Sequence, residues 1–202
     1  MHRSTLAALA AAPAAALAAA GLLHPHHLTT ATADTWVLLH LAGLLVFPLV
    51  GAGLVVPLAG RGDPVAWLVR VAAYVYATAY TALDVVSGIG AGWVTSRLPD
   101  GAPRPQEVSW LFRIGTPIGE VGSWALLVAT VVLVLDALRR RGPAALPLVL
   151  LPVGAWAVHA DHIFAPVGAL GMAMIAVGTL LAVLGARPRH DVRSTVKATF
   201  SG

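Results

Sequence analysis

The stretch that decides the fold runs from residue 35 to residue 58 and reads TWVLLHLAGLLVFPLVGAGLVVPL. It contains no Asp, Glu, Lys or Arg. With a rise of about 1.5 Å per residue, a helix of this length crosses a hydrocarbon core about 30 Å thick. Its apolar residues do not alternate with polar ones, as they would in the strands of a transmembrane barrel. The stretch therefore predicts a membrane-spanning α-helix.

The composition of the whole chain supports the same class. Of its 202 residues, 58% are hydrophobic and only 11% are charged, whereas a soluble domain is about half apolar and about a quarter charged. Backbone groups in lipid must find their hydrogen bonds internally, so apolar runs of this length are helices. We expect an all-α, polytopic transmembrane bundle that forms a single integral membrane domain over residues 1–202.

Six spans are predicted, at about residues 5–23, 35–58, 64–87, 116–138, 143–162 and 166–185. Asp63-Pro64 and Thr116-Pro117 each place an N-cap residue before a proline at the first helical position. A loop is expected at 91–115 and a tail at 187–202. A second interpretation remains open for the first run, whose small residues before Gly21 resemble a signal-peptide cleavage site. Cleavage there would leave five spans.

The basic residues predict the orientation of the bundle. Ten of the 13 lysines and arginines lie at alternate ends of the predicted spans, and the other three lie in the 91–115 loop. Because cytoplasmic loops carry the excess of basic residues, both termini are expected in the cytoplasm and the loop outside. Basic residues at span ends face lipid headgroups, so the net charge of +4 indicates a bilayer partner and no nucleic acid.

Ionisable residues inside the predicted spans gather at the outer end of the bundle. A charged side chain inside a span is costly, so such residues are candidates for function. His40 lies in the second span, Asp84 at the outer end of the third, and Glu120 in the first turn of the fourth. Tyr80 is a further candidate, because it shares a helix face with Asp84. The other candidates at this end are His159, Asp161 and His162 at the end of the fifth span, and His24, His26 and His27 after the first span.

Several of these residues also have ordinary explanations. Histidines near the water boundary, such as His24, are more often solvated than bound to a ligand. A carboxylate such as Glu120 is favourable at a helix N-terminus without any function. His159 and His162 are spaced i and i+3, so on one helix they would share a face and could bind one ion.

Three stretches resemble a group of small multi-span membrane proteins of high-GC actinobacteria. They are HLAGLLVFP at 40–48, the segment from Tyr80 through Asp84 to Gly90, and DHIFAP at 161–166. The resemblance implies a helical fold in a bacterial inner membrane, and it implies no activity. The Ala, Gly and Arg bias of the chain agrees with a high-GC source.

The favoured hypothesis is a metal site with His40, Asp84, His159 and His162 as ligands, and with Glu120, His24, Asp161 and Tyr80 as secondary candidates. Imidazole and carboxylate ligands without any cysteine suit divalent zinc, copper, iron or nickel. Such a metal could activate water for chemistry on a lipophilic small molecule that enters from the bilayer. Whether the protein is an enzyme stays open at this point, as do its substrate and its oligomeric state.

Three alternatives stay open beside the metal site. In a b-type haem protein, His40 and His162 would be the axial ligands. In a proton-coupled transporter, Asp84, Glu120 and His40 would relay protons, although transporter sites usually lie nearer the midplane. In a structural accessory subunit, the polar layer would only lock the helices together.

Overall fold

The computed structural model describes residues 2–186, which are helical almost throughout and contain no strand. The all-α class is therefore confirmed. Helices α1 (Arg3–Leu23) and α2 (Ala33–Val55) come first, and the 3₁₀ turn η1 (Val56–Leu58) extends α2. The remaining elements are α3 (Pro64–Leu83), the π-helical η2 (Asp84–Gly90), α4 (Ala91–Thr95), α5 (Gln106–Arg141), the 3₁₀ segment η3 (Gly142–Val149), α6 (Leu150–Asp161) and α7 (Val167–Gly185).

Four helical stretches of the described chain are long and apolar enough to cross a membrane. They are Arg3–Leu23, Ala33–Leu58, Gln106–Asp161 and Val167–Gly185. The third of these is 56 residues long and reverses at Gly142, whose φ of 61° is unstrained only in glycine. Helix α3 is not among the four because Arg70 and its tyrosines lower its hydropathy. A helical membrane protein is supported, but the predicted number of six spans is not confirmed.

Two predicted boundaries are wrong. The fourth span was expected to begin at Thr116, but α5 begins at Gln106 and carries Pro117 inside the helix. Its first turns are helical because Val108 is buried against the neighbouring segments and Pro105 precedes the helix as its N-cap. The predicted loop at 91–115 is correspondingly shorter, since its first residues form α4. Within the predicted 91–115 loop, only residues 96–105 lie outside a helix.

Two other spans differ from a plain α-helix. The third continues past residue 87 through η2 and α4, and the first part of the fifth is the 3₁₀ segment η3. Pro143 and Pro147 lack backbone N–H groups, so two hydrogen bonds of an α-helical ladder are missing within this eight-residue segment. The predicted N-cap at Asp63 is confirmed, because its carboxylate accepts a hydrogen bond from the Ala66 N–H at 3.2 Å. The predicted tail at 187–202 lies outside the described residues.

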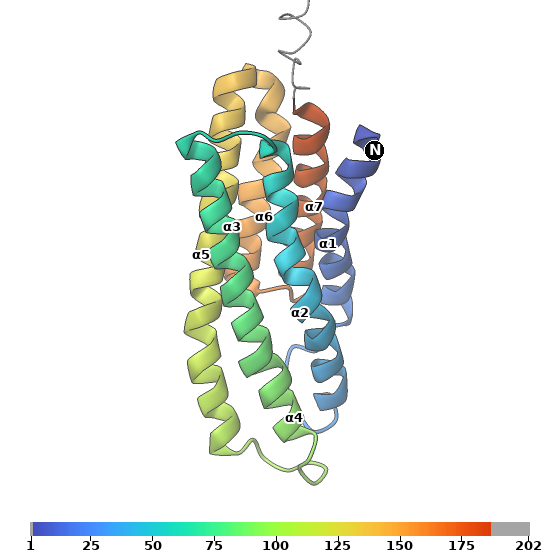
Figure 1. The fold of residues 1–202 in the computed structure, drawn as a ribbon. Helices are drawn as coiled ribbons and strands as arrows, with labels where there is room; N and C mark the ends of the chain where they lie inside the picture. The colour runs from blue at the N-terminus through green and yellow to red at the C-terminus, as the bar shows by residue number, and fades with distance from the viewer. Residues whose placement is uncertain (1, 187–202) are drawn as a thin grey trace, which may run out of the picture.

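The helices pack side by side as one bundle (Figure 1). Neighbouring pairs in contact include α3 with α5, α1 with α7, α6 with α7, and α2 with both α1 and α3. At one end lie the start of α1, the turn between α5 and η3, and the end of α7. At the other end, α2, α4 and α5 extend past the ends of α1, α6 and α7 (Figure 1).

The longer helices carry a small apolar cluster of their own beyond the main core. We call it the apolar cap, and it consists of Leu28, Ala33, Trp36, Ala91 and Val108, with Leu111, Phe112 and Phe164 packed against it. It lies at the end of the bundle where the shorter helices have already stopped. Polar side chains at the ends of α1 and α6 are consequently covered rather than left in water.

Candidate metal centre

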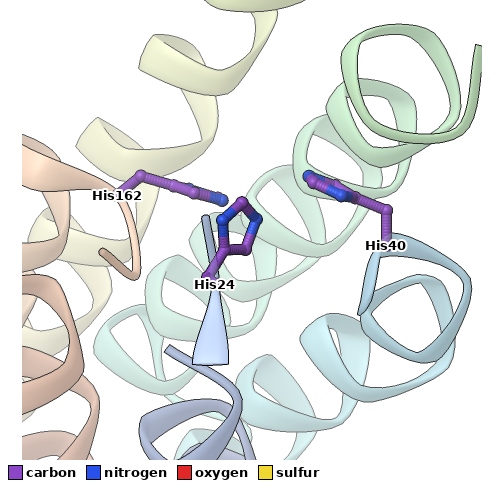
Figure 2. A group of neighbouring side chains, drawn as sticks. All are labelled: His24, His40 and His162. Atoms are coloured by element: carbon purple, nitrogen blue, oxygen red, sulfur yellow. The ribbon is translucent and has the colours of Figure 1, made fainter. Parts of the chain in front are cut away.

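Three histidines from three separate segments meet beneath the apolar cap. His24 directly follows α1, His40 lies in α2, and His162 directly follows α6. Each offers one ring nitrogen, and these three atoms all lie within 4.8 Å of one another. Figure 2 shows His24 between the other two rings, and the ring centroids of His24 lie 5.1 Å from His40 and 6.2 Å from His162.

Backbone hydrogen bonds determine which ring nitrogen of His24 and of His40 is available to bind a metal. The Nδ1 of His24 lies 2.8 Å from the Pro25 carbonyl oxygen, and the Nδ1 of His40 lies 2.7 Å from that of Trp36. A carbonyl can only accept, so each Nδ1 carries the proton and donates it. Each Nε2 then keeps its lone pair. Metal-bound histidines are held in the same way, by a hydrogen bond from the nitrogen that does not bind the metal.

The third histidine is held by aromatic contacts. His162 ends α6 with a φ of 51° and is the only non-glycine residue in the described chain with a positive φ. Its ring stacks on Tyr80 at 5.7 Å between centroids and on Phe47 at 5.8 Å. This conformation turns the chain out of the helix, so His162 no longer shares a helical face with His159.

Asp84 lies beside the three histidines. It is fully buried, and neither of its carboxylate oxygens has a hydrogen-bond partner among residues 2–186. Its Oδ1 lies 4.0 Å from the Nε2 of His40. Two glycines make room for this arrangement: a Cβ at Gly43 would lie 2.9 Å from Oδ2 of Asp84, and a Cβ at Gly88 would collide with the His40 ring.

A cavity of about 310 Å³, which we call the side cavity, adjoins two of the three histidines. His40 and His162 line one part of it, and Glu120, Ser123 and His159 line another. Trp36, Tyr80, Phe112 and Phe164 give it aromatic walls. Trp36 belongs to the apolar cap, and Phe112 and Phe164 pack against it, so the cap forms part of the wall of this cavity.

The structure brings together some of the predicted ligands and separates others. His40, Asp84 and His162 lie close together, and Tyr80 stacks on His162. His159 does not belong to the group of three. Its Nδ1 lies 2.8 Å from the Ser123 Oγ, and its ring lies 4.4 Å from the Trp124 ring. His159 remains on α6 whereas His162 has left it, so the i, i+3 argument fails at the end of the helix.

His24 joins the group in the place where His159 was expected. It is only 5% exposed, unlike the exposed His26 and His27 two and three residues later. The sequence does hold a signal for this difference, because His24 directly follows the apolar run while the other two lie beyond Pro25.

The remaining secondary candidates lie outside the three-histidine group. Glu120 lines the side cavity, and its backbone carbonyl accepts a hydrogen bond from the Ser123 hydroxyl. Asp161 is the last residue of α6, and its carbonyl accepts a hydrogen bond from the Phe164 N–H. Neither carboxylate belongs to the group.

Comparison with known proteins identifies no relative for this chain. No family model matches it. No curated protein is significantly similar to it, and no solved structure is either. The function must therefore be inferred from the geometry of the three histidines and the cavity beside them.

Proposed function

We propose that this protein is a polytopic membrane protein that binds one divalent transition-metal ion through His24, His40 and His162. The observation that carries the proposal is the convergence of three ligand nitrogens within 4.8 Å, supplied by three segments far apart in the sequence. In a tetrahedral site with bonds of 2.0–2.1 Å, ligand nitrogens lie about 3.4 Å apart. A bound ion would therefore draw the three nitrogens closer together by about 1.4 Å or less.

The environment supports a bound cation. Buried polar groups are normally satisfied, yet Nε2 of His24 and both oxygens of Asp84 are buried without a partner. A divalent ion would take the lone pair of His24 and balance the charge of Asp84. Three neutral imidazoles with a nearby carboxylate suit zinc, and also divalent iron, nickel or copper.

Three protein ligands leave the fourth position of a tetrahedral ion for water or a substrate. His40 and His162 line the side cavity, so an open position directed there would face its aromatic walls. Because aromatic side chains line this cavity, we propose that it takes a lipophilic small molecule, which reaches this position from the bilayer. Glu120 and His159 line the same cavity and could exchange a proton with such a molecule.

The haem alternative fits the geometry less well. A porphyrin would have to pass between its two axial histidines and extend about 5 Å to every side of the iron. The His24 ring stands between His40 and His162 (Figure 2), and the rings of Trp36 and Phe164 lie 4.8 Å and 4.7 Å from His24. The macrocycle would displace all three of these rings, which favours a bare ion over haem.

We further propose six membrane crossings in a bacterial inner membrane, with both termini in the cytoplasm. Segment η3 rises about 2.0 Å per residue and α6 about 1.5 Å, so Gly142–Asp161 extends about 34 Å and is long enough to cross. Helix α3 has 20 residues and by itself extends about 30 Å, which is also long enough to cross. On this placement the three histidines lie near the outer boundary of the bilayer.

The experiment is a metal titration of detergent-purified protein that has been stripped with a chelator. We expect one Zn²⁺ or Co²⁺ per chain by calorimetry, and the Co²⁺ complex should show the visible absorption of tetrahedral coordination. Substituting His24, His40 or His162 by Ala should each weaken binding by about 100-fold or more. His27→Ala is the matched control, since His27 is exposed, and it should change the affinity by less than about twofold.

Two outcomes would overturn the proposal. A wild-type protein that binds no metal and shows no Soret band, but that is destabilised by His24→Ala, would leave the structural explanation. A Soret band that is lost in His40→Ala and His162→Ala would instead establish the haem alternative. Thermal unfolding of every variant without metal separates lost binding from lost folding.

A further inference from the structure

The opposite end of the bundle contains a second cavity of about 310 Å³, independent of the metal centre. It lies between η1, α5, η3 and α7, and its charged lining consists of Arg61, Arg140, Arg141 and the carboxylate of Asp136. The deeper wall is apolar and is formed by Leu58, Leu133, Leu148 and Ala182. A cationic rim above an apolar wall is complementary to a ligand with an anionic head and a hydrocarbon body.

Two of these arginines are held in place by aspartates. Arg61 donates hydrogen bonds to both carboxylate oxygens of Asp63 at 2.8 Å, and this contact holds the pKa of Asp63 well below its usual range. Arg61 and Arg140 both donate to Asp136, which is nearly buried. The two aspartates thus fix the positions of two guanidinium groups at the edge of the cavity.

The third arginine has no such partner. Among residues 2–186, no side chain forms a hydrogen bond or a close ion pair with the guanidinium of Arg141, although this residue is only half-exposed. Its guanidinium lies against Gly185 of α7, where a Cβ would collide with it. Six arginines lie at this end of the described chain and only two acidic residues, Asp63 and Asp136, face them. The net charge at this end is therefore positive, and Arg141 contributes a positive charge to the lining of the cavity.

We propose that this cavity binds the phosphate group of an anionic phospholipid, with Arg141 as the principal contact and Arg61 and Arg140 beside it. Guanidinium groups bind phosphate oxygens through paired, charge-assisted hydrogen bonds. The apolar wall would cover the first part of an acyl chain. The chain's own residues after Ala186 do not complement the cavity, because they carry four basic side chains and one acidic one.

The test compares lipid binding by detergent-purified wild type, Arg141→Gln and the matched control Arg139→Gln. Arg139 is the same residue type two positions away, but it is exposed and does not line the cavity. Phosphatidylglycerol should bind to the wild type and raise its unfolding temperature, whereas zwitterionic phosphatidylcholine should do so much less. We expect Arg141→Gln to weaken phosphatidylglycerol binding by about tenfold, and Arg139→Gln by less than about twofold.

Inorganic phosphate is the second probe and separates the two sources of the anion. If phosphate alone binds with the same dependence on Arg141 and the lipid does not, the lipid assignment is overturned. Equal losses in the two variants would mean general surface attraction and would also overturn the proposal. The unfolding temperature of each variant without lipid shows whether Arg141→Gln still folds.

Discussion

Both carboxylate oxygens of Asp84 are buried without a hydrogen-bond partner in the described part of the chain, and Oδ1 lies 4.0 Å from the Nε2 of His40. An ionised carboxylate in such a place is expensive unless a cation or a proton compensates it. A metal ion held by the neighbouring histidines would supply the cation. Asp84 is therefore the residue whose substitution tests most directly whether the centre holds a metal.

Asp84→Asn keeps the shape of the side chain and removes its charge. If Asp84 balances a bound ion, we expect the affinity for Zn²⁺ to fall by about 10–100-fold, as when other groups that support metal ligands are changed. The metal-free protein should be as stable as the wild type or more so, because a neutral amide costs less to bury. Calorimetric titration and thermal unfolding measure the two effects. An unchanged affinity would mean that Asp84 is protonated and does not act on the metal.

At the scale of elements, the close approach of α3 and α5 positions Tyr80 against His162. Glycines on α5 permit this approach: a Cβ at Gly119 would lie 2.8 Å from Leu83, and one at Gly122 would lie 2.7 Å from the Tyr80 ring. Small residues drive helix association in membranes because they let backbones pack closely. Only the tertiary structure shows which residues these glycines face.

Gly122→Ala should force the Tyr80 ring and the Ala79 side chain away from α5. We expect a loss of stability of about 1–3 kcal/mol, as for other overpacked sites, measured by unfolding in detergent. Gly62→Ala serves as the control, since nothing lies within 4 Å of a Cβ at that position. Equal stability of the two variants would show that α3 can shift on α5 without cost.

At the scale of the whole molecule, the two ends of the bundle differ in chemistry. One end holds three imidazoles beneath an apolar cap, and the other holds the arginine-lined cavity. Because basic ends face the cytoplasm, this asymmetry predicts the orientation as well as the division of roles.

The absence of cysteine makes the orientation easy to test. Asp100→Cys places one thiol in the exposed 96–105 turn, and Arg139→Cys places one at the arginine end. A membrane-impermeant maleimide should label Asp100→Cys in intact cells and label Arg139→Cys only after permeabilisation. The reverse pattern would invert the bundle and place the histidines near the cytoplasm. Labelling of both in intact cells would contradict a sealed six-span topology.

The sequence by itself determined the helical class, because long apolar runs without charge have few other solutions in lipid. It also determined that the ionisable residues gather toward one end, since their distance along each span follows from a fixed rise per residue. The tertiary structure decided which of them meet. Helical periodicity predicted that His159 and His162 share a face. The positive φ of His162 instead turns this residue out of the helix and brings it to His24 and His40. Phe47 and Tyr80 from other helices pack against His162 in this turn. Because these contacts come from distant parts of the sequence, no local pattern within residues 159–162 predicts the turn.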